Sequence, residues 1–237
     1  MESKSLNKYI AETGICSRRQ ADVMIEEGRV KINGKIARKG NRVEAGDKVE
    51  LDGQLIGNDK PERVYIAFNK PVGVTCTTDR NDPDNIIDFL QFPERIFPIG
   101  RLDKMSEGLL LLTNDGDIVN KILRSRNQHE KEYVVEVNQV VIPEFVEKMA
   151  SGVPILGTVT KPCYVEKLTD YTFRMILTQG LNRQIRRMCS ALGYHVRKLK
   201  RIRIMHVQLD DLPSRSWRYL TSAEMEQMEK ALKYSDK

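Results

Sequence analysis

A run of four leucines and a threonine, residues 109–113, constrains the fold of this chain more than any other segment. The run has no polar alternation, and the turn signal Asn114-Asp115-Gly116 follows it directly. An uninterrupted apolar run of this length is typical of a strand that is buried on both faces. We therefore predict a central strand here, which would be a rigid base for any group that precedes it.

A carboxylate stands just before this predicted strand. Asp103 lies between Gly100 and Gly108, and Arg101 comes two residues before it. In an extended segment, side chains two residues apart point to the same side, so Arg101 and Asp103 could contact the same substrate. An aspartate near a glycine often does no more than cap a turn, and the spacing alone leaves both interpretations open.

The charge of the chain favours a polyanionic partner. Its 237 residues include 39 Lys and Arg against 33 Asp and Glu, for a net charge of +6. Residues 183–203 contain eight basic side chains and no acidic one, whereas a solvated helix face usually mixes both signs. The eight are Arg183, Arg186, Arg187, Arg197, Lys198, Lys200, Arg201 and Arg203.

The apolar segments and the cysteines indicate where the protein is located and whether it binds metal. No apolar segment is long enough to span a bilayer and the N-terminus has no hydrophobic signal region, so we expect a cytoplasmic protein. Cys16, Cys76, Cys163 and Cys189 are far apart, and no histidine stands at metal-ligand spacing. We therefore expect reduced thiols and no metal site.

Residues 1–58 are expected to form a small domain with its linker. A capping box at 17–20 predicts a helix over 18–27, after a shorter helix over 6–12. Short strands are predicted around the hairpin signal Asn33-Gly34 and at 48–51. Arg18 and Arg19 would lie at a helix start, where free backbone N–H groups add to their attraction for phosphate. Residues 53–62 lack periodicity and are interpreted as a linker.

Residues 59–237 are expected to form an α+β domain. A buried strand is predicted over 64–68, ending in a turn at 69–73. Strands outnumber helices beyond it and show no regular βαβ rhythm, so a largely antiparallel sheet with flanking helices is predicted. The predicted strands are 133–137, 164–168, 172–177 and 196–203, and the predicted helices are 117–123, 143–150, 184–192 and 222–232.

Two further groups of residues are candidates for binding. Tyr133, after Lys131, offers a flat apolar face with a polar tip that suits stacking on an extruded base, although a half-buried strand aromatic would show the same spacing. Residues 180–188 form a loop that runs into a helix. There Asn182, Arg183 and Gln184 are candidate RNA contacts, because the latter two would lie at the helix start. Arg186, one turn into the helix, could reach a buried carboxylate.

These segments resemble a known family. Residues 100–103 and 108–116 are similar to the signature of the RsuA/RluB/RluE/RluF family of ribosomal RNA pseudouridine synthases. Residues 6–11, 14–22, 30–34 and 46–47 resemble the S-four (alpha-L) RNA-binding domain. The resemblance extends over about 6–232, and 129–133 and 152–160 look most similar to the RluF type.

The resemblance implies a mechanism and roles. Asp103 would be the catalytic residue, Tyr133 would stack on the target uracil, and Arg186 would pair with the aspartate and favour its charged form. Apart from the resemblance, Arg101 is a candidate for filling the vacated stack or holding the neighbouring phosphate, and Lys131 is a candidate RNA contact. The implied fold is a long central sheet with the active-site cleft across its middle. The expected protein is a monomer that binds a stem-loop of large-subunit ribosomal RNA.

The expected reaction needs no cofactor. It breaks the N1–C1′ bond of uridine and joins C5 to the same C1′, without redox change or loss of a group. The carboxylate could attack C1′ or C6, or act as a base at C2′, and the residues do not choose among these routes. Alternatives are a synthase that acts on transfer RNA and a non-catalytic RNA-binding or ribosome-assembly factor, although the intact set of Asp103, Tyr133 and Arg186 argues against the latter.

Overall fold

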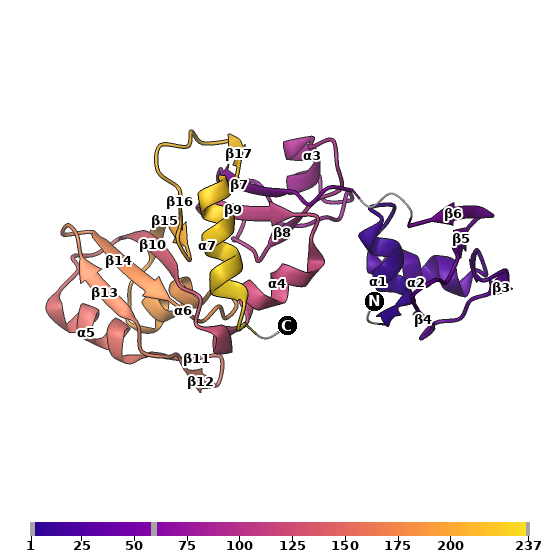
Figure 1. The fold of residues 1–237 in the computed structure, drawn as a ribbon. Coiled ribbons are helices and arrows are strands. Elements are labelled where there is room, and N and C mark those ends of the chain that lie inside the picture. Colours follow the sequence, from indigo (N-terminus) through magenta and orange to yellow (C-terminus); the bar gives the residue numbers. More distant parts are fainter. Residues whose placement is uncertain (1–2, 58–60, 236–237) are drawn as a thin grey trace. The chain divides into compact units, whose positions relative to one another are not determined.

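A computed structural model describes residues 3–57 and 61–235 (Figure 1). The chain divides into two compact units. The N-terminal unit extends to Val64 and includes two later pieces, Phe92–Ile96 and Asn114–Gly116, and the larger unit contains the rest. No helix among the described residues is both long and apolar enough to cross a membrane.

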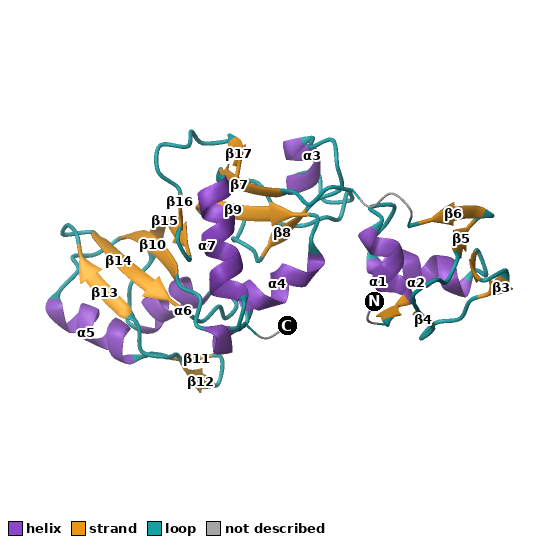
Figure 2. Cartoon of the chain, in the orientation of Figure 1, coloured by secondary structure: helices purple, strands orange, loops and turns teal. Residues whose placement is uncertain are grey.

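The N-terminal unit combines two helices with short strands (Figure 2). Its helices are α1 (Leu6–Glu12) and α2 (Arg18–Glu26), and the capping box between Ser17 and Gln20 is present as predicted. The turn residues Asn33 and Gly34 have φ of 51° and 76°, the left-handed values that a two-residue hairpin requires. The strands are β1 (Lys4–Ser5) with β4 (Arg42–Val43), and a sheet in the order β3 (Lys35–Ile36), β2 (Val30–Ile32), β5 (Val49–Leu51), β6 (Gln54–Ile56).

The linker predicted over 53–62 is partly wrong. Residues 54–56 form β6, which pairs antiparallel with β5. Asp52 and Gly53 have φ of 50° and 81°, so they make a second tight hairpin turn where a domain end was expected. A strand of three residues is too short to show periodicity. Residues 58–60 of the predicted linker lie outside the described residues.

The larger unit is built on a nine-stranded sheet. Its pairings are antiparallel except that β15 and β9 run parallel, so the predicted α+β fold with a mainly antiparallel sheet is confirmed. The main path runs β13 (Tyr164–Lys167), β14 (Thr172–Leu177), β10 (Lys131–Val137), β15 (Val196–Ile204), β9 (Glu107–Thr113), β7 (Tyr65–Lys70), β17 (Trp217–Tyr219), with β16 (Val207–Gln208) beside β15 and β8 (Phe97–Ile99) beside β9.

Helices and short elements complete this unit. The predicted helices all form, and α3 and the β11–β12 hairpin were not predicted. The elements are α3 (Ile86–Leu90), α4 (Gly116–Leu123), η1 (Ser125–Asn127), α5 (Pro143–Ser151), β11 (Pro154–Ile155), β12 (Thr158–Val159), α6 (Gln184–Ala191) and α7 (Ser222–Leu232).

The predicted central strand is buried on both faces. Leu109 and Leu111 belong to a core cluster with Ile122 of α4 and Met228 of α7. Figure 1 shows the helices α4 and α7 near β9. The intervening leucines at 110 and 112 are also fully buried. Because this strand is held from both sides, the loop that precedes it and contains Asp103 starts from a fixed point.

Gly108 lets β9 and β15 approach each other. Its φ is +102°, and a Cβ at this position would collide with the backbone oxygen and nitrogen of Arg201. Only glycine tolerates both conditions. The parallel pairing therefore places the Cα of Arg201 opposite Gly108, five residues after Asp103 in the chain.

Candidate active site

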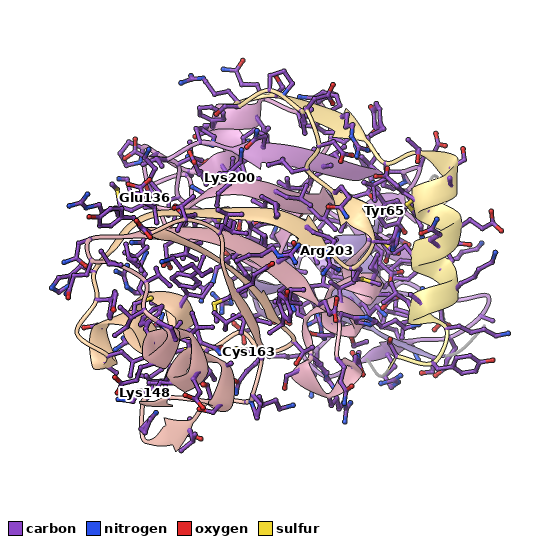
Figure 3. All side chains as sticks on the ribbon, turned by 90° about the vertical axis from the view of Figure 1, so that its left-hand side faces the viewer. Tyr65, Glu136, Lys148, Cys163, Lys200 and Arg203 are labelled. Carbon is purple, nitrogen blue, oxygen red and sulfur yellow. The ribbon has the colours of Figure 1, made fainter. Side chains whose placement is uncertain are left out.

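A cavity of about 880 Å³ lies over the middle of the large sheet. Side chains of the central strands β10 and β15 line it, together with the loop before β9 and the loop that leads into α6. Figure 3 shows the side chains around this sheet, with Glu136 of β10 and Lys200 and Arg203 of β15 labelled. The lining includes the predicted site residues Arg101, Asp103, Lys131, Tyr133, Asn182, Arg183, Gln184 and Arg186.

Asp103 lies close to two guanidinium groups. Its Oδ2 is 3.7 Å from Nε of Arg186 and 3.9 Å from Nη1 of Arg183. Its side chain is 32% exposed, so a substrate in the cavity can reach it. The backbone N–H of Ser106 donates to the Asp103 carbonyl oxygen at 2.9 Å, which closes the loop into a tight turn. The carboxylate is thus accessible, oriented and held next to positive charge.

Arg186 is anchored to the loop that carries this carboxylate. Its Nη2 donates to the Met105 carbonyl oxygen at 2.8 Å and to Ser106 Oγ at 3.2 Å. Its Nη1 donates to the carbonyl oxygen of Val196, at 3.3 Å, on β15. Burial and the neighbouring Arg183 lower the pKa of Arg186, and Asp103 opposes that shift. The arginine therefore fixes the position of the loop as well as its electrostatic environment.

Lys70 also holds this loop, although the sequence did not point to it as a site residue. Its fully buried ammonium group donates to the carbonyl oxygens of Pro71 at 2.9 Å, Val74 at 2.8 Å and Lys104 at 3.5 Å. Burial lowers the pKa of Lys70. A lysine at the end of a mostly buried strand, residues 65–70, is the signal that could have identified it, because a buried cation needs partners of this kind.

Tyr133 and Lys131 lie on β10, at the floor of the cavity. They are 9% and 7% exposed, respectively. The Cα of Tyr133 faces that of Arg201 across the β10–β15 pairing. Lys131 Nζ donates to the His129 carbonyl oxygen at 3.0 Å, and burial, with the charge of Arg201, lowers the pKa of Lys131 to about 8. Lys131 is thus too deep to bind an RNA phosphate outside the cavity.

The polar residues of the loop before α6 differ in exposure, and therefore in role. Arg183 is the N-cap of α6 in the left-handed conformation, with a side chain that is 50% exposed. Asn182 is exposed and accepts hydrogen bonds from Arg187. Gln184 is buried, and its side chain accepts from the backbone N–H of Leu181 at 3.0 Å and donates to Gln179 at 3.3 Å. Gln184 therefore braces the loop, and its polar atoms are already engaged.

The remaining basic residues separate into different environments. Arg18 and Arg19 are exposed at the start of α2 in the N-terminal unit. Arg203, within the basic run, is paired with Glu130 and Glu132 at 3.0 and 2.7 Å. The run is therefore not one uniform surface. Arg201, which the sequence did not single out, is buried and lines the cavity.

The thiols are free and scattered. The four cysteines form no disulfide, and burial raises the pKa of Cys189 to about 12. Within residues 3–57 and 61–235, no three His, Cys, Asp or Glu side chains gather into an arrangement that could hold a metal ion.

Comparison with known proteins identifies the family. Residues 64–191 match the model of the RNA pseudouridylate synthase family, and residues 5–49 match the S4 domain. The first match covers the cavity except for its β15 residues. The chain belongs to the RNA pseudouridylate synthase family, and it is an RNA-binding pseudouridine synthase with an S4 domain.

Individual relatives place the chain within this family. It is 56% identical, over 94% of its length and 77% of the relative's, to the dual-specificity RNA pseudouridine synthase RluF of Escherichia coli strain K12. It is 35% identical to ribosomal large subunit pseudouridine synthase B of Bacillus subtilis, over 94% of both chains. A crystal structure of a pseudouridylate synthase matches with a TM-score of 0.70 and 33% identity, over 95% of this chain and 99% of the other. The predicted resemblance to the RsuA/RluB/RluE/RluF family is confirmed.

Proposed function

We propose that this enzyme converts one or more uridines of large-subunit ribosomal RNA to pseudouridine, with Asp103 as its catalytic carboxylate. The observation that carries the proposal is the position of Asp103, accessible in the cavity and 3.7 Å from the anchored guanidinium of Arg186. A relative at 35% identity is named for the large ribosomal subunit, which supports that class of substrate.

The reaction needs an ionised carboxylate at a fixed point. The bond from C1′ to N1 breaks, the base turns, and C5 forms the new bond to C1′, while a proton leaves C5 and N1 gains one. A carboxylate can act as nucleophile or as base in such a sequence, and adjacent positive charge keeps it ionised. Arg186 and Arg183 supply that charge at Oδ2 of Asp103, and the side chain is exposed enough for the ribose to reach it.

The target nucleotide must leave its stack to reach Asp103. Extrusion costs a few kcal/mol and is least costly for a loop or bulge nucleotide, so a stem-loop target is favoured. Inside the cavity, the ring of Tyr133 offers a stacking surface for the uracil. Arg101 and Arg183 are exposed at the mouth, where they can bind the flanking phosphates or fill the vacated stack.

The N-terminal unit would add affinity for RNA. Arg18 and Arg19 are exposed at the first turn of α2, where helix geometry favours phosphate. We treat residues 1–58 as an RNA-binding domain with its linker and 59–237 as the catalytic domain. We also propose that the enzyme acts as a monomer, and in the cytoplasm, where it would meet its RNA.

A second target class is favoured by one specific observation. Relatives at 56% identity are named dual-specificity RNA pseudouridine synthases. We therefore propose transfer RNA as a further substrate of this chain. An extruded uridine in a transfer RNA loop presents the same base and ribose to the cavity as one in ribosomal RNA.

Mapping of pseudouridines tests the proposal. Total RNA from cells with and without this protein would be compared, with the wild-type chain and Asp103→Asn each restored to the deficient cells. We expect one or a few sites in large-subunit ribosomal RNA, and a site in transfer RNA, to disappear and to return only with the wild type. Identical maps in all four cell lines would reject the function, and a return of the sites with Asp103→Asn would reject the role of this carboxylate.

A further inference from the structure

Arg201 is a buried cation at the floor of the cavity that the reaction proposed above does not use. Its side chain is 3% exposed, and its Nε donates to the Leu109 carbonyl oxygen at 2.7 Å. Its Nη2 is buried and has no hydrogen-bond partner among the described residues. A buried charged donor without a partner is costly, so its presence calls for a physical explanation.

The sheet places Arg201 beside the proposed base-stacking residue. Arg201 is the Cα partner of Tyr133 on β10 and of Gly108 on β9. Residues directly opposite each other on neighbouring strands point to the same face of a sheet. Both side chains line the cavity. A base stacked on Tyr133 would therefore lie next to the guanidinium of Arg201.

The basic residues that line the cavity differ in burial, and this determines which part of the RNA each can contact. The charged residues that line the cavity are one acid, Asp103, and six bases: Arg101, Lys104, Lys131, Arg183, Arg186 and Arg201. Arg101, Lys104 and Arg183 are exposed, so they can reach phosphates of the RNA backbone. Lys131 and Arg201 are buried and can interact only with a group that enters the cavity. In the reaction proposed above, that group is the base.

Lys131 and Arg201 repel each other, which makes an anion the matching ligand. Burial is the main cause that lowers the pKa of Lys131 to about 8, and the charge of Arg201 is the second. Arg201 also contributes to the lowered pKa of Lys70. A cluster of cations in a site of low dielectric is unfavourable until negative charge arrives, and it then stabilises that charge strongly.

We propose that Arg201, assisted by Lys131, stabilises the negative charge of the detached uracil. This inference rests on the proposed function. When the C1′–N1 bond breaks, its electron pair stays on N1, and the charge spreads over the ring nitrogen and the carbonyl oxygens. The charge disappears from the base when C5 bonds to C1′; the proton at C5 then leaves, and N1 gains a proton. Arg201 would act between cleavage of the C1′–N1 bond and formation of the C5–C1′ bond, after Asp103 has engaged the ribose.

The test varies the stability of the base anion. Fragments of the mapped RNA would carry uridine or 5-fluorouridine at the target, because fluorine withdraws electrons and a fluorinated base anion needs less stabilisation. Single-turnover loss of the target nucleoside, measured after digestion, counts cleavage of the C1′–N1 bond on either RNA. Arg201→Met should lower the rate on uridine by roughly a hundredfold, as loss of a preorganised charge donor does, and on 5-fluorouridine by about tenfold or less.

Matched variants keep the result interpretable. Arg201→Lys keeps the charge and should retain more activity than Arg201→Met, whereas Arg197→Met removes an exposed cation from the same strand and should not show the dependence on fluorine. If Arg201→Met does not fold because its bond to Leu109 is lost, Lys131→Met provides the same comparison. Melting temperatures report on folding.

The outcomes separate this inference from the function on which it rests. Equal losses on both RNAs, or no loss, would reject anion stabilisation by Arg201 and leave it a packing residue. Wild-type turnover of the uridine RNA is scored independently, because its absence would reject the proposed function as well.

Discussion

The guanidinium of Arg186 holds the Asp103 loop at two points while it pairs with the carboxylate. Its Nη2 binds the Met105 carbonyl oxygen and Ser106 Oγ, and its Nε lies 3.7 Å from Asp103 Oδ2 without a hydrogen-bond partner. The distance permits an ion pair and exceeds that of a hydrogen bond. Arg186 is thus a positioning residue whose effect on Asp103 combines charge with geometry.

Arg186→Lys separates these two contributions. Lysine keeps the charge but cannot bridge Met105, Ser106 and Val196 at once, since it lacks the planar fork of arginine. We expect kcat to fall by roughly tenfold to a hundredfold, the cost of misplacing a catalytic group, with little change in KM. Steady-state kinetics measure this. Arg215→Lys, an exposed position outside the cavity lining, is the control, and wild-type kcat in Arg186→Lys would show that charge alone suffices.

Substitutions at Tyr133 test the stacking surface. Tyr133→Phe keeps the ring and should retain most of the activity. Tyr133→Leu removes a stacking interaction worth about 1–3 kcal/mol per base, so kcat/KM should fall by roughly fivefold to a hundredfold or more. Tyr164→Leu changes an exposed tyrosine on β13 outside the cavity and should have no such effect. Equal losses for Tyr133→Phe and Tyr133→Leu would assign the role to the hydroxyl group instead.

The pH dependence of the single-turnover rate should reflect the titration of Lys131. Burial and Arg201 lower the pKa of Lys131 to about 8, so its ammonium is charged below that pH and neutral above it. If the charge assists the reaction, the single-turnover rate should fall as the pH rises through about 8. Lys131→Arg should move this alkaline limb to higher pH, because arginine stays protonated. If the alkaline limb of the pH–rate profile is the same in Lys131→Arg as in the wild type, the titration belongs to another group.

Arg18 and Arg19 are expected to contribute affinity without contributing to the chemical step. Each phosphate contact that the double variant Arg18→Ala/Arg19→Ala loses should reduce the slope of log K against log salt by about 0.7 on single-stranded RNA. Binding measured over a range of salt tests this, with kcat at saturating RNA unchanged. Arg29→Ala is the matched control, since Asp52 and Glu27 already engage Arg29, and an equal change in its slope would contradict a specific role for α2.

The sequence predicted those elements whose signals are local. The Ser17 capping box, the Asn33-Gly34 turn and the leucine strand depend on neighbours within a few residues, and each formed as expected. The strand β6 was missed because three residues carry no period. Asp103 and Arg186 were assigned through family motifs, and the structure brings them together from separate elements.

Arg201 could not be found in this way. In the sequence it is one of eight basic residues in a run that suggested a surface for RNA. Its burial depends on the register of β15 against Tyr133 and Gly108, which are distant in the chain. Pairing register is a tertiary property, since a shift by one residue would turn the same side chain to the other face of the sheet.

Single-turnover kinetics of Asp103→Asn test the central claim most directly. Asparagine preserves the shape of the side chain but is neither an ionised nucleophile nor a base, so the rate of pseudouridine formation should fall by many orders of magnitude. Binding of the same RNA and the melting temperature should stay close to those of the wild type. A rate above about a thousandth of the wild-type value, a loss of less than about 4 kcal/mol of transition-state stabilisation, would contradict Asp103 as the catalytic carboxylate.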